Sequence, residues 1–150
     1  MDFLSGQIII YTSRRYEEIY RHLNSDFGIK YHELFILCAS LGMYGGKKEI
    51  LNEYGRELRS NYFNRAQKAT AYTIILSDEE IGRQVSKFED RDFITEAKKT
   101  LEKYAEGGMN ILVKDVFGSK WNGRGLDKGY REYDIDIISY FYGEGIKIPF

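Results

Sequence analysis

The stretch YHELFILCASLGMY, residues 31–44, is apolar on nearly every side of a helix, and Gly45 and Gly46 follow it directly. A helix that is apolar all round has to be buried. The stretch is well short of the roughly 20 residues that a membrane span needs. Because glycine favours the carboxyl end of a helix, we predict a helix over Tyr31–Tyr44 at the centre of a helical bundle.

The flanking sequence carries signals for further helices. Ser13 is the predicted cap of a helix with Tyr16, Ile19, Tyr20 and Leu23 on one face, and Asn64 is the predicted cap of a helix from Arg65 to Leu76. The sequence Ser77-Asp78-Glu79-Glu80 fits a capping box. Asp90 or Asp92 is expected to begin another helix, whose apolar stripe consists of Phe93, Ile94, Ala97, Leu101 and Tyr104. Gly107 and Gly108 are expected to end the last of these helices. The segment 109–117 is ambiguous, and Asp134 to Tyr142 indicates a final helix.

Two short segments near the ends of the chain favour strands. Gln7 to Tyr11 and Ile146 to Ile148 are β-prone and are candidates for a small terminal ribbon. Tyr72 to Leu76 is rich enough in β-branched residues to leave a strand open there. One proline in 150 residues favours helices. We therefore predict a mainly α fold, a compact bundle of five or six helices forming a single domain over residues 1–150.

Composition and charge exclude several classes of protein. The chain carries 22 Lys and Arg against 23 Asp and Glu, a net charge of -1, which excludes a histone-like binder of polyanions. Cys38 is the only cysteine, so no intramolecular disulfide forms. The amino-terminal residues lack the basic region and cleavage site of a secretory signal. These features predict a cytoplasmic protein.

Residues for catalysis are not arranged in a recognisable pattern. His22, His32 and Cys38 do not have the spacing of a zinc site, no G-x-S-x-G motif is present, and no cofactor is predicted. Glu96 and Lys98 have the E-x-K spacing of one class of metal-dependent nucleases, with Asp90 and Asp92 upstream. Residues two apart on a helix do not face each other, so we expect a non-enzymatic protein and keep the nuclease as an alternative.

A local excess of cations suggests a surface for phosphates. Between residues 47 and 68 there are six cations and three acids, interleaved with Tyr54, Tyr62 and Phe63. If the cations share a face, they form a positive patch suited to nucleic acid. The predicted contacts are Lys47, Lys48, Arg56, Arg59 and Arg65. The alternative is an ordinary solvated face.

The segment 118–129 contains four glycines and predicts a loop before the carboxy-terminal helix and tail. Its Lys120, Trp121 and Arg124 could stack a base or dock a partner. Together with the terminal tyrosines Tyr140 and Tyr142, they are the predicted partner-binding residues. A plain surface loop is the alternative.

Three runs of sequence resemble one bacterial family. They are Tyr31 to Gly42 followed by Gly45-Gly46-Lys47-Lys48, Gly55-Arg56-Glu57-Leu58-Arg59 leading to Tyr62-Phe63, and Lys103 to Leu112. In this order they are similar to small accessory proteins encoded beside DNA phosphorothioation (Dnd-type) modification and restriction genes. The resemblance covers roughly residues 15–115, and the carboxy-terminal portion departs from it. It implies a cytoplasmic protein of phage defence and no catalytic residues.

Two functions follow from these observations. The first is a non-enzymatic accessory or regulatory factor of a bacterial DNA modification–restriction system that binds DNA or a partner protein. The alternative is a protein–protein inhibitor or regulator of phage or mobile-element origin, acting through its aromatic carboxy-terminal region.

Overall fold

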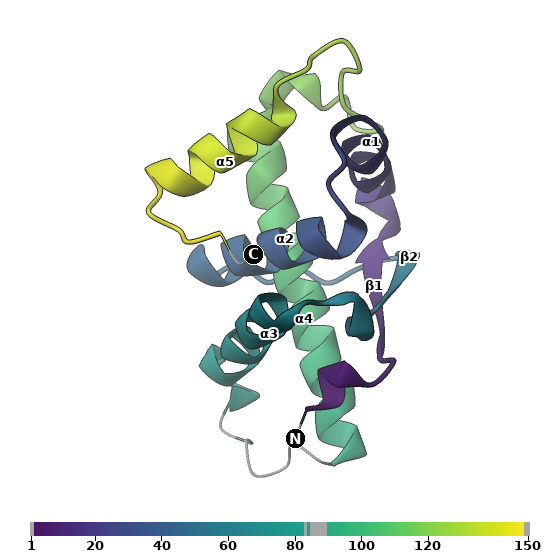
Figure 1. The fold of residues 1–150 in the computed structure, drawn as a ribbon, viewed down its shortest axis with the longest axis vertical. Coiled ribbons are helices and arrows are strands. Elements are labelled where there is room, and N and C mark those ends of the chain that lie inside the picture. The colour runs from purple at the N-terminus through teal and green to yellow at the C-terminus, as the bar shows by residue number, and fades with distance from the viewer. Residues whose placement is uncertain (1, 83, 85–89, 149–150) are drawn as a thin grey trace.

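Helix α2, Tyr31–Tyr44, crosses the long helix α4, Arg91–Leu112, at the centre of the fold (Figure 1). The computed structural model describes residues 2–82, 84 and 90–148. The remaining regular elements in those residues are α1 Glu17–Phe27, α3 Arg65–Ser77, α5 Tyr133–Gly143, the strands β1 Ile9–Ser13 and β2 Tyr54–Arg59, 3-10 turns at Phe3–Ser5, Arg14–Tyr16, Ser60–Tyr62 and Gly118–Lys120, and a π-helical turn at Val113–Phe117. The predicted mainly α fold is confirmed.

Helix α2 is buried from several sides, as its composition requires. Its six consecutive residues from Leu34 to Ala39 are all buried. It packs against α1, α3 and α4, and Figure 1 shows α1 and α5 towards one end of α4 and α3 towards the other. The predicted boundaries of this helix, Tyr31 and Tyr44, are confirmed.

Glycines allow α2 and α4 to approach each other closely. A Cβ on Gly108 would lie 1.7 Å from the Cys38 carbonyl oxygen, and one on Gly42 would lie 2.1 Å from the Tyr104 carbonyl oxygen. A Cβ on Gly107 would lie 2.1 Å from the Lys47 carbonyl oxygen. The prediction that Gly107 and Gly108 end a helix is wrong, since α4 continues to Leu112. These glycines are the places where backbone packs directly on α4.

The β-ribbon pairs β1 with β2 and not with the carboxy-terminal segment. The strands are antiparallel, with Ile10 opposite Leu58 and Tyr11 opposite Glu57. The strand at the amino-terminal end is confirmed, but its predicted partner, Ile146 to Ile148, is wrong. β2 has only one buried residue, Leu58, so it lacks the alternation of apolar and polar residues by which a half-buried strand is predicted.

Helix starts were predicted with mixed success. Asn64 caps α3, because its Oδ1 accepts the Gln67 N–H at 2.8 Å while Gln67 Oε1 accepts the Asn64 N–H at 2.8 Å. Asp90 caps α4 by accepting the Asp92 N–H at 2.8 Å. The segment Tyr72 to Leu76 lies in α3 and is not a strand.

Two predicted caps are wrong. Ser13 ends β1 and makes no capping hydrogen bond, and α1 begins at Glu17 after a 3-10 turn. Ser77 is the last residue of α3, and the following Asp78 accepts the N–H groups of Glu80 and Ile81 at 3.0 Å each. A carboxylate one residue later satisfies the free N–H groups that the serine was expected to cap. Part of the helix predicted after Ser77 lies outside the described residues.

The carboxy-terminal third follows the prediction in outline. The segment 109–117 completes α4 and continues as the π-helical turn. In the predicted loop, Trp121 pairs with Leu126 across a tight turn, where Asn122 Oδ1 accepts the N–H groups of Arg124 and Gly125. The predicted final helix is α5, which places Ile137 and Phe141 in the core.

Candidate nucleic-acid interface

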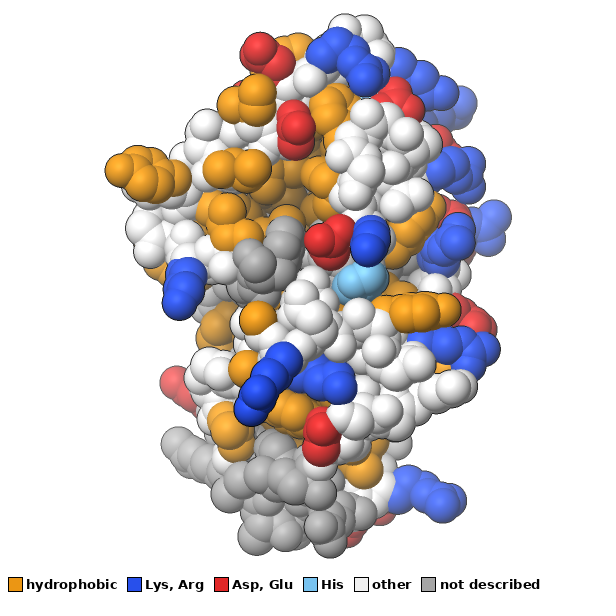
Figure 2. Space-filling model, in the orientation of Figure 1, with side chains coloured by type: hydrophobic (Ala, Val, Ile, Leu, Met, Phe, Trp, Pro, Cys, Tyr) orange, Lys and Arg blue, Asp and Glu red, His pale blue; other side chains and the backbone are white. Residues whose placement is uncertain are grey.

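A groove of about 440 Å³ lies between the amino-terminal end of α2 and strand β2. The residues that line it and carry its chemistry are Lys30, Tyr31, His32, Arg56 and Tyr62. Figure 2 shows a histidine side chain at this end of α2, with cationic and hydrophobic side chains beside it. The groove therefore combines cations and aromatic rings on an accessible face.

Flat groups are stacked in pairs along this groove. The Arg56 guanidinium carbon lies 4.3 Å from the centre of the Tyr31 ring, and Tyr31 stacks on Tyr20 with ring centres 5.9 Å apart. His32 stacks on Tyr62 with centres 6.1 Å apart and planes at 29°. Tyr62 is 62% exposed. A planar ligand could stack on the exposed ring of Tyr62 or on the Arg56 guanidinium.

The electrostatics of the groove favour an anion beside these rings. Lys30 and Arg56 are both exposed, and the groove contains the first residues of α2, where a helix presents free N–H groups and the positive end of its dipole. Glu33 Oε1 is occupied because it accepts the Lys30 N–H at 2.9 Å. Glu57 is the one acid that lines the groove among the described residues.

His32 contributes a neutral ring and not a cation at neutral pH. Burial lowers the pKa of its imidazole below the ordinary value of 6.5, and Lys30 lowers it further, whereas Glu33 raises it. A neutral imidazole has one donor and one acceptor nitrogen. It is therefore suited to stacking and to hydrogen bonds with a base, while Arg56 and Lys30 supply the charge.

The five cations predicted to contact nucleic acid do not share one face. Arg56 lines the groove, but Arg59 lies three residues along the same strand and points to the other side of the ribbon, where its Nη1 donates to Gln7 Oε1 at 2.8 Å. Arg65 is exposed at the first position of α3. Only Arg56 of the five lines the groove.

Lys47 and Lys48 lie in the connection from α2 to β2. Lys48 Nζ is 2.9 Å from Oδ2 of Asp78, whose side chain is 2% exposed, and the hydrogen bond to Asp78 raises the pKa of Lys48. Asp78 Oδ2 also accepts the Tyr104 hydroxyl at 2.7 Å. Lys47 Nζ is 4.0 Å from Glu49 Oε1. Lys48 therefore belongs to a buried structural contact and not to a free positive patch.

The predicted partner-binding residues are also divided. Lys120 Nζ lies 4.3 Å from the Tyr130 ring centre, and Trp121 packs on Tyr16 with ring centres 5.7 Å apart. Arg124 is exposed in the tight turn. The Tyr140 hydroxyl donates to Asp115 Oδ2 at 3.0 Å, whereas Tyr142 is 88% exposed at the far end of α5 from this loop (Figure 1).

Sequence reasoning missed Lys30, Tyr31 and His32 as site residues. Tyr31 and His32 begin the predicted buried helix and Lys30 has no predicted role, although this basic and aromatic triplet precedes a run that is otherwise apolar. The change from basic and aromatic residues to apolar residues at the first turn was the feature from which a site could have been predicted. Tyr62 was noted among the aromatic residues near the cations, but its contact with His32 joins residues 30 positions apart and leaves no local pattern.

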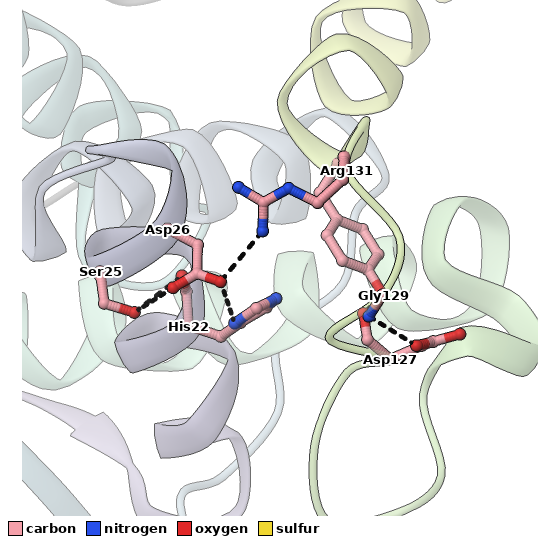
Figure 3. Close-up of polar contacts among 7 residues, drawn as sticks. His22, Ser25, Asp26, Asp127, Gly129 and Arg131 are labelled. Atoms are coloured by element: carbon pink, nitrogen blue, oxygen red, sulfur yellow. Dashed lines mark hydrogen bonds and ion pairs between the residues drawn. The ribbon is translucent and has the colours of Figure 1, made fainter.

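A polar cluster around Asp26 joins α1 to the segment that precedes α5 (Figure 3). Asp26 Oδ2 lies 3.5 Å from His22 Nδ1 and accepts Arg131 Nη1 at 3.2 Å, while Asp26 Oδ1 accepts the Ser25 hydroxyl at 2.8 Å. The hydrogen bond from Ser25 lowers the pKa of Asp26. The Ser25 hydroxyl contacts the Asp26 carboxylate and the His22 backbone carbonyl but not the imidazole, so this is not the order of a Ser-His-Asp nucleophile.

Glu96 and Lys98, the nuclease alternative, lie on α4 without converging. Glu96 is exposed, and Lys98 Nζ is 5.3 Å from the Tyr11 ring centre. Within the described part of the chain, no three His, Cys, Asp or Glu side chains are grouped as a metal would require.

None of the described helices combines the length and apolar composition needed to cross a bilayer. Comparison with known proteins found no matching family model, curated protein or solved structure.

Proposed function

We propose that the protein is a non-enzymatic factor that binds single-stranded DNA, or an unpaired nucleotide of a longer DNA, in the groove between α2 and β2. The observation that carries the proposal is the Arg56 guanidinium stacked 4.3 Å over Tyr31, beside the stacked pair of His32 and Tyr62 at the start of α2. Bases of any sequence stack on such flat groups, and phosphates are attracted to the guanidinium and to the helix terminus.

The size of the groove favours an unpaired nucleotide over a duplex. Its volume of about 440 Å³ lies in the range of pockets for small ligands. A base that is paired in a duplex has its faces covered by its neighbours and cannot reach an aromatic ring. Tyr62, 62% exposed, presents its ring to an unpaired base.

The cellular role that we propose is that of an accessory factor in a bacterial DNA modification–restriction system, located in the cytoplasm. The support for this setting is the resemblance of residues 15–115 to proteins encoded beside Dnd-type genes. Gene neighbourhood provides the test. Adjacency to sulfur-modification genes agrees with the proposal, whereas a phage setting would favour an inhibitor.

The DNA-binding activity is tested by fluorescence anisotropy over a series of salt concentrations. The two probes are a labelled single-stranded oligonucleotide and the same oligonucleotide annealed to its complement as a duplex. We expect tighter binding of the single strand, and an affinity that falls linearly with salt on logarithmic axes with a slope of about -0.7 for each phosphate neutralised. Binding that does not depend on salt, or no binding of either oligonucleotide, would contradict the proposal.

A protein partner on α5 is a second candidate function, because α5 exposes an apolar face. Ile135, Ile138 and Tyr142 follow the spacing of one helix face, and each side chain is more than half exposed. An apolar pocket of about 260 Å³ lies beside them against α2, and Figure 2 shows hydrophobic side chains gathered around this hollow. Apolar patches of this kind mark contact surfaces.

Point substitutions test this second function better than truncation, because α5 also contributes to the core. We expect Ile138→Asp to abolish retention of a partner in a pull-down from the native host. Ile50→Asp is the matched control, since Ile50 is 72% exposed and lies in the connection before β2. Equal retention by both variants would exclude α5 as the interface.

A further inference from the structure

A second pocket, of about 390 Å³, lies on another part of the molecule from the groove. It is enclosed by the end of β1, the connection from α2 to β2, and α4. Its lining includes Ser13, Glu49, Glu53, Glu106 and Asn110. The pocket is therefore surrounded mainly by groups that can form hydrogen bonds.

Two of the lining side chains are buried acceptors without a matching cation. Glu106 is 9% exposed and Ser13 is 3% exposed. Among the described residues, no cation lies within ion-pair distance of Glu106, and the Ser13 hydroxyl, which lies close enough to the Glu106 carboxyl to lower its pKa, makes no other hydrogen bond. Buried polar groups are almost always satisfied by protein, water or ligand. The Glu106 carboxyl and the Ser13 hydroxyl oxygen thus keep acceptor positions that no described cation fills.

The two arginines of the pocket already have partners, and so does the Asn110 side-chain oxygen. Arg14 Nη1 is 3.5 Å from Glu53 Oε2, and the Arg15 guanidinium lies 5.0 Å from the Tyr16 ring centre. The Tyr16 hydroxyl donates to Asn110 Oδ1, which leaves the Asn110 amide group. Both exposed arginines are therefore engaged, while the buried Glu106 carboxyl has no cation as a partner.

The carboxyl of Glu106 is held in an environment that disfavours its charge. Burial raises its pKa above the ordinary value of 4.5 and Glu49 raises it further, whereas Ser13 and Arg15 lower it. A positively charged ligand would favour the ionised form, because an opposite charge nearby stabilises a carboxylate.

We propose that this pocket binds a small organic cation, an amine or a guanidinium, whose N–H groups donate to the Glu106 carboxylate and the Ser13 hydroxyl. Two buried acceptors close to each other select a ligand with several donors. The volume exceeds that of a bare ion and lies within the range of ligand pockets. Either a free metabolite or an arginine side chain of a peptide can supply the guanidinium group.

Isothermal titration calorimetry of the full chain tests this site with matched ligands. Agmatine represents a free guanidinium compound, and N-acetyl-arginine-amide represents a peptide side chain. N-acetyl-citrulline-amide has nearly the same shape without the charge. We expect binding of one or both guanidinium probes and at least tenfold weaker binding of the citrulline compound. Absence of binding by either guanidinium probe, or equal binding of the citrulline compound, would overturn the proposal.

Two variants separate the site from a general effect on folding. Glu106→Gln keeps the shape and removes a buried charge, so we expect it to fold and to weaken binding at least tenfold. Glu96→Gln removes an exposed carboxylate of the same helix, outside the pocket, and should leave the affinity unchanged. Retained binding in Glu106→Gln, or loss that is equal in both variants, would contradict the assignment. DNA binding by Glu106→Gln should equal that of wild type, since the groove is a separate site.

Discussion

Substituting Gly108 by alanine tests the close crossing of α2 and α4, on which the whole fold depends. The added Cβ would lie 1.7 Å from the Cys38 carbonyl oxygen, whereas ordinary contact begins at 3.4 Å. The helices must therefore separate by roughly the difference between these distances. Because the obstacle is backbone and not a flexible side chain, the cost lies at the upper end of that for overpacking, about 3 kcal/mol.

The same substitution also has a favourable effect that must be subtracted. Alanine is better than glycine in a helix by about 1 kcal/mol, so the expected net loss of unfolding free energy is about 2 kcal/mol. Urea unfolding followed by far-UV circular dichroism measures this loss. Gly143→Ala is the matched control, because Gly143 ends α5 and a Cβ there meets nothing within 4 Å.

We expect Gly143→Ala to unfold within about 0.5 kcal/mol of wild type, as is usual for surface changes. A Gly108→Ala variant as stable as wild type would contradict the close crossing, since the two helices would then have room for a methyl group. A loss of similar size in both variants would also refute it, because the effect would not depend on the crossing.

Three further predictions concern stability and reactivity. Burial raises the pKa of Asp78, but hydrogen bonds from Tyr104 and Lys48 outweigh it and lower the pKa from 3.8 to about 2. The corresponding stabilisation of about 2 kcal/mol is complete above pH 3.8 and is lost as the pH falls through about 2. Asp78→Asn should therefore lower the urea midpoint at pH 7 and differ little from wild type near pH 2. Burial raises the pKa of the Cys38 thiol, so iodoacetamide should modify Cys38 only in urea, and rapid modification of the folded protein would contradict its burial. Asn64→Ala removes the capping hydrogen bond to Gln67 and should cost about 1 kcal/mol in urea unfolding, whereas an unchanged midpoint would show that this cap does not matter.

The central helix could be predicted from local sequence alone, because an apolar run of 14 residues has few alternatives. The glycines of α4 could not be interpreted in the same way. Gly107 and Gly108 have the composition of a helix end, and they are instead the places where the backbones at Lys47 and Cys38 approach. Glycine permits both arrangements, and the difference depends on residues 60 to 70 positions away in the chain.

The candidate site could be predicted only in part for a similar reason. The excess of cations between residues 47 and 68 was visible, but strand alternation places Arg56 and Arg59 on opposite faces. Lys48 contacts Asp78, 30 residues further on, and so leaves the surface patch. Lys30 and His32, which line the groove with Arg56, precede that segment. Which charges remain free depends on pairing across the fold and not on their density in the sequence.

The most direct test of DNA binding in the groove compares two arginines of one strand. Arg56→Gln removes the guanidinium stacked on Tyr31, whereas Arg59→Gln removes one that contacts Gln7 on the other face. In anisotropy titrations with single-stranded DNA, we expect Arg56→Gln to bind roughly tenfold more weakly, with the salt slope reduced by about 0.7, and Arg59→Gln to bind like wild type. Equal affinity of Arg56→Gln and wild type, or an equal loss in both variants, would contradict the assignment of DNA binding to this groove.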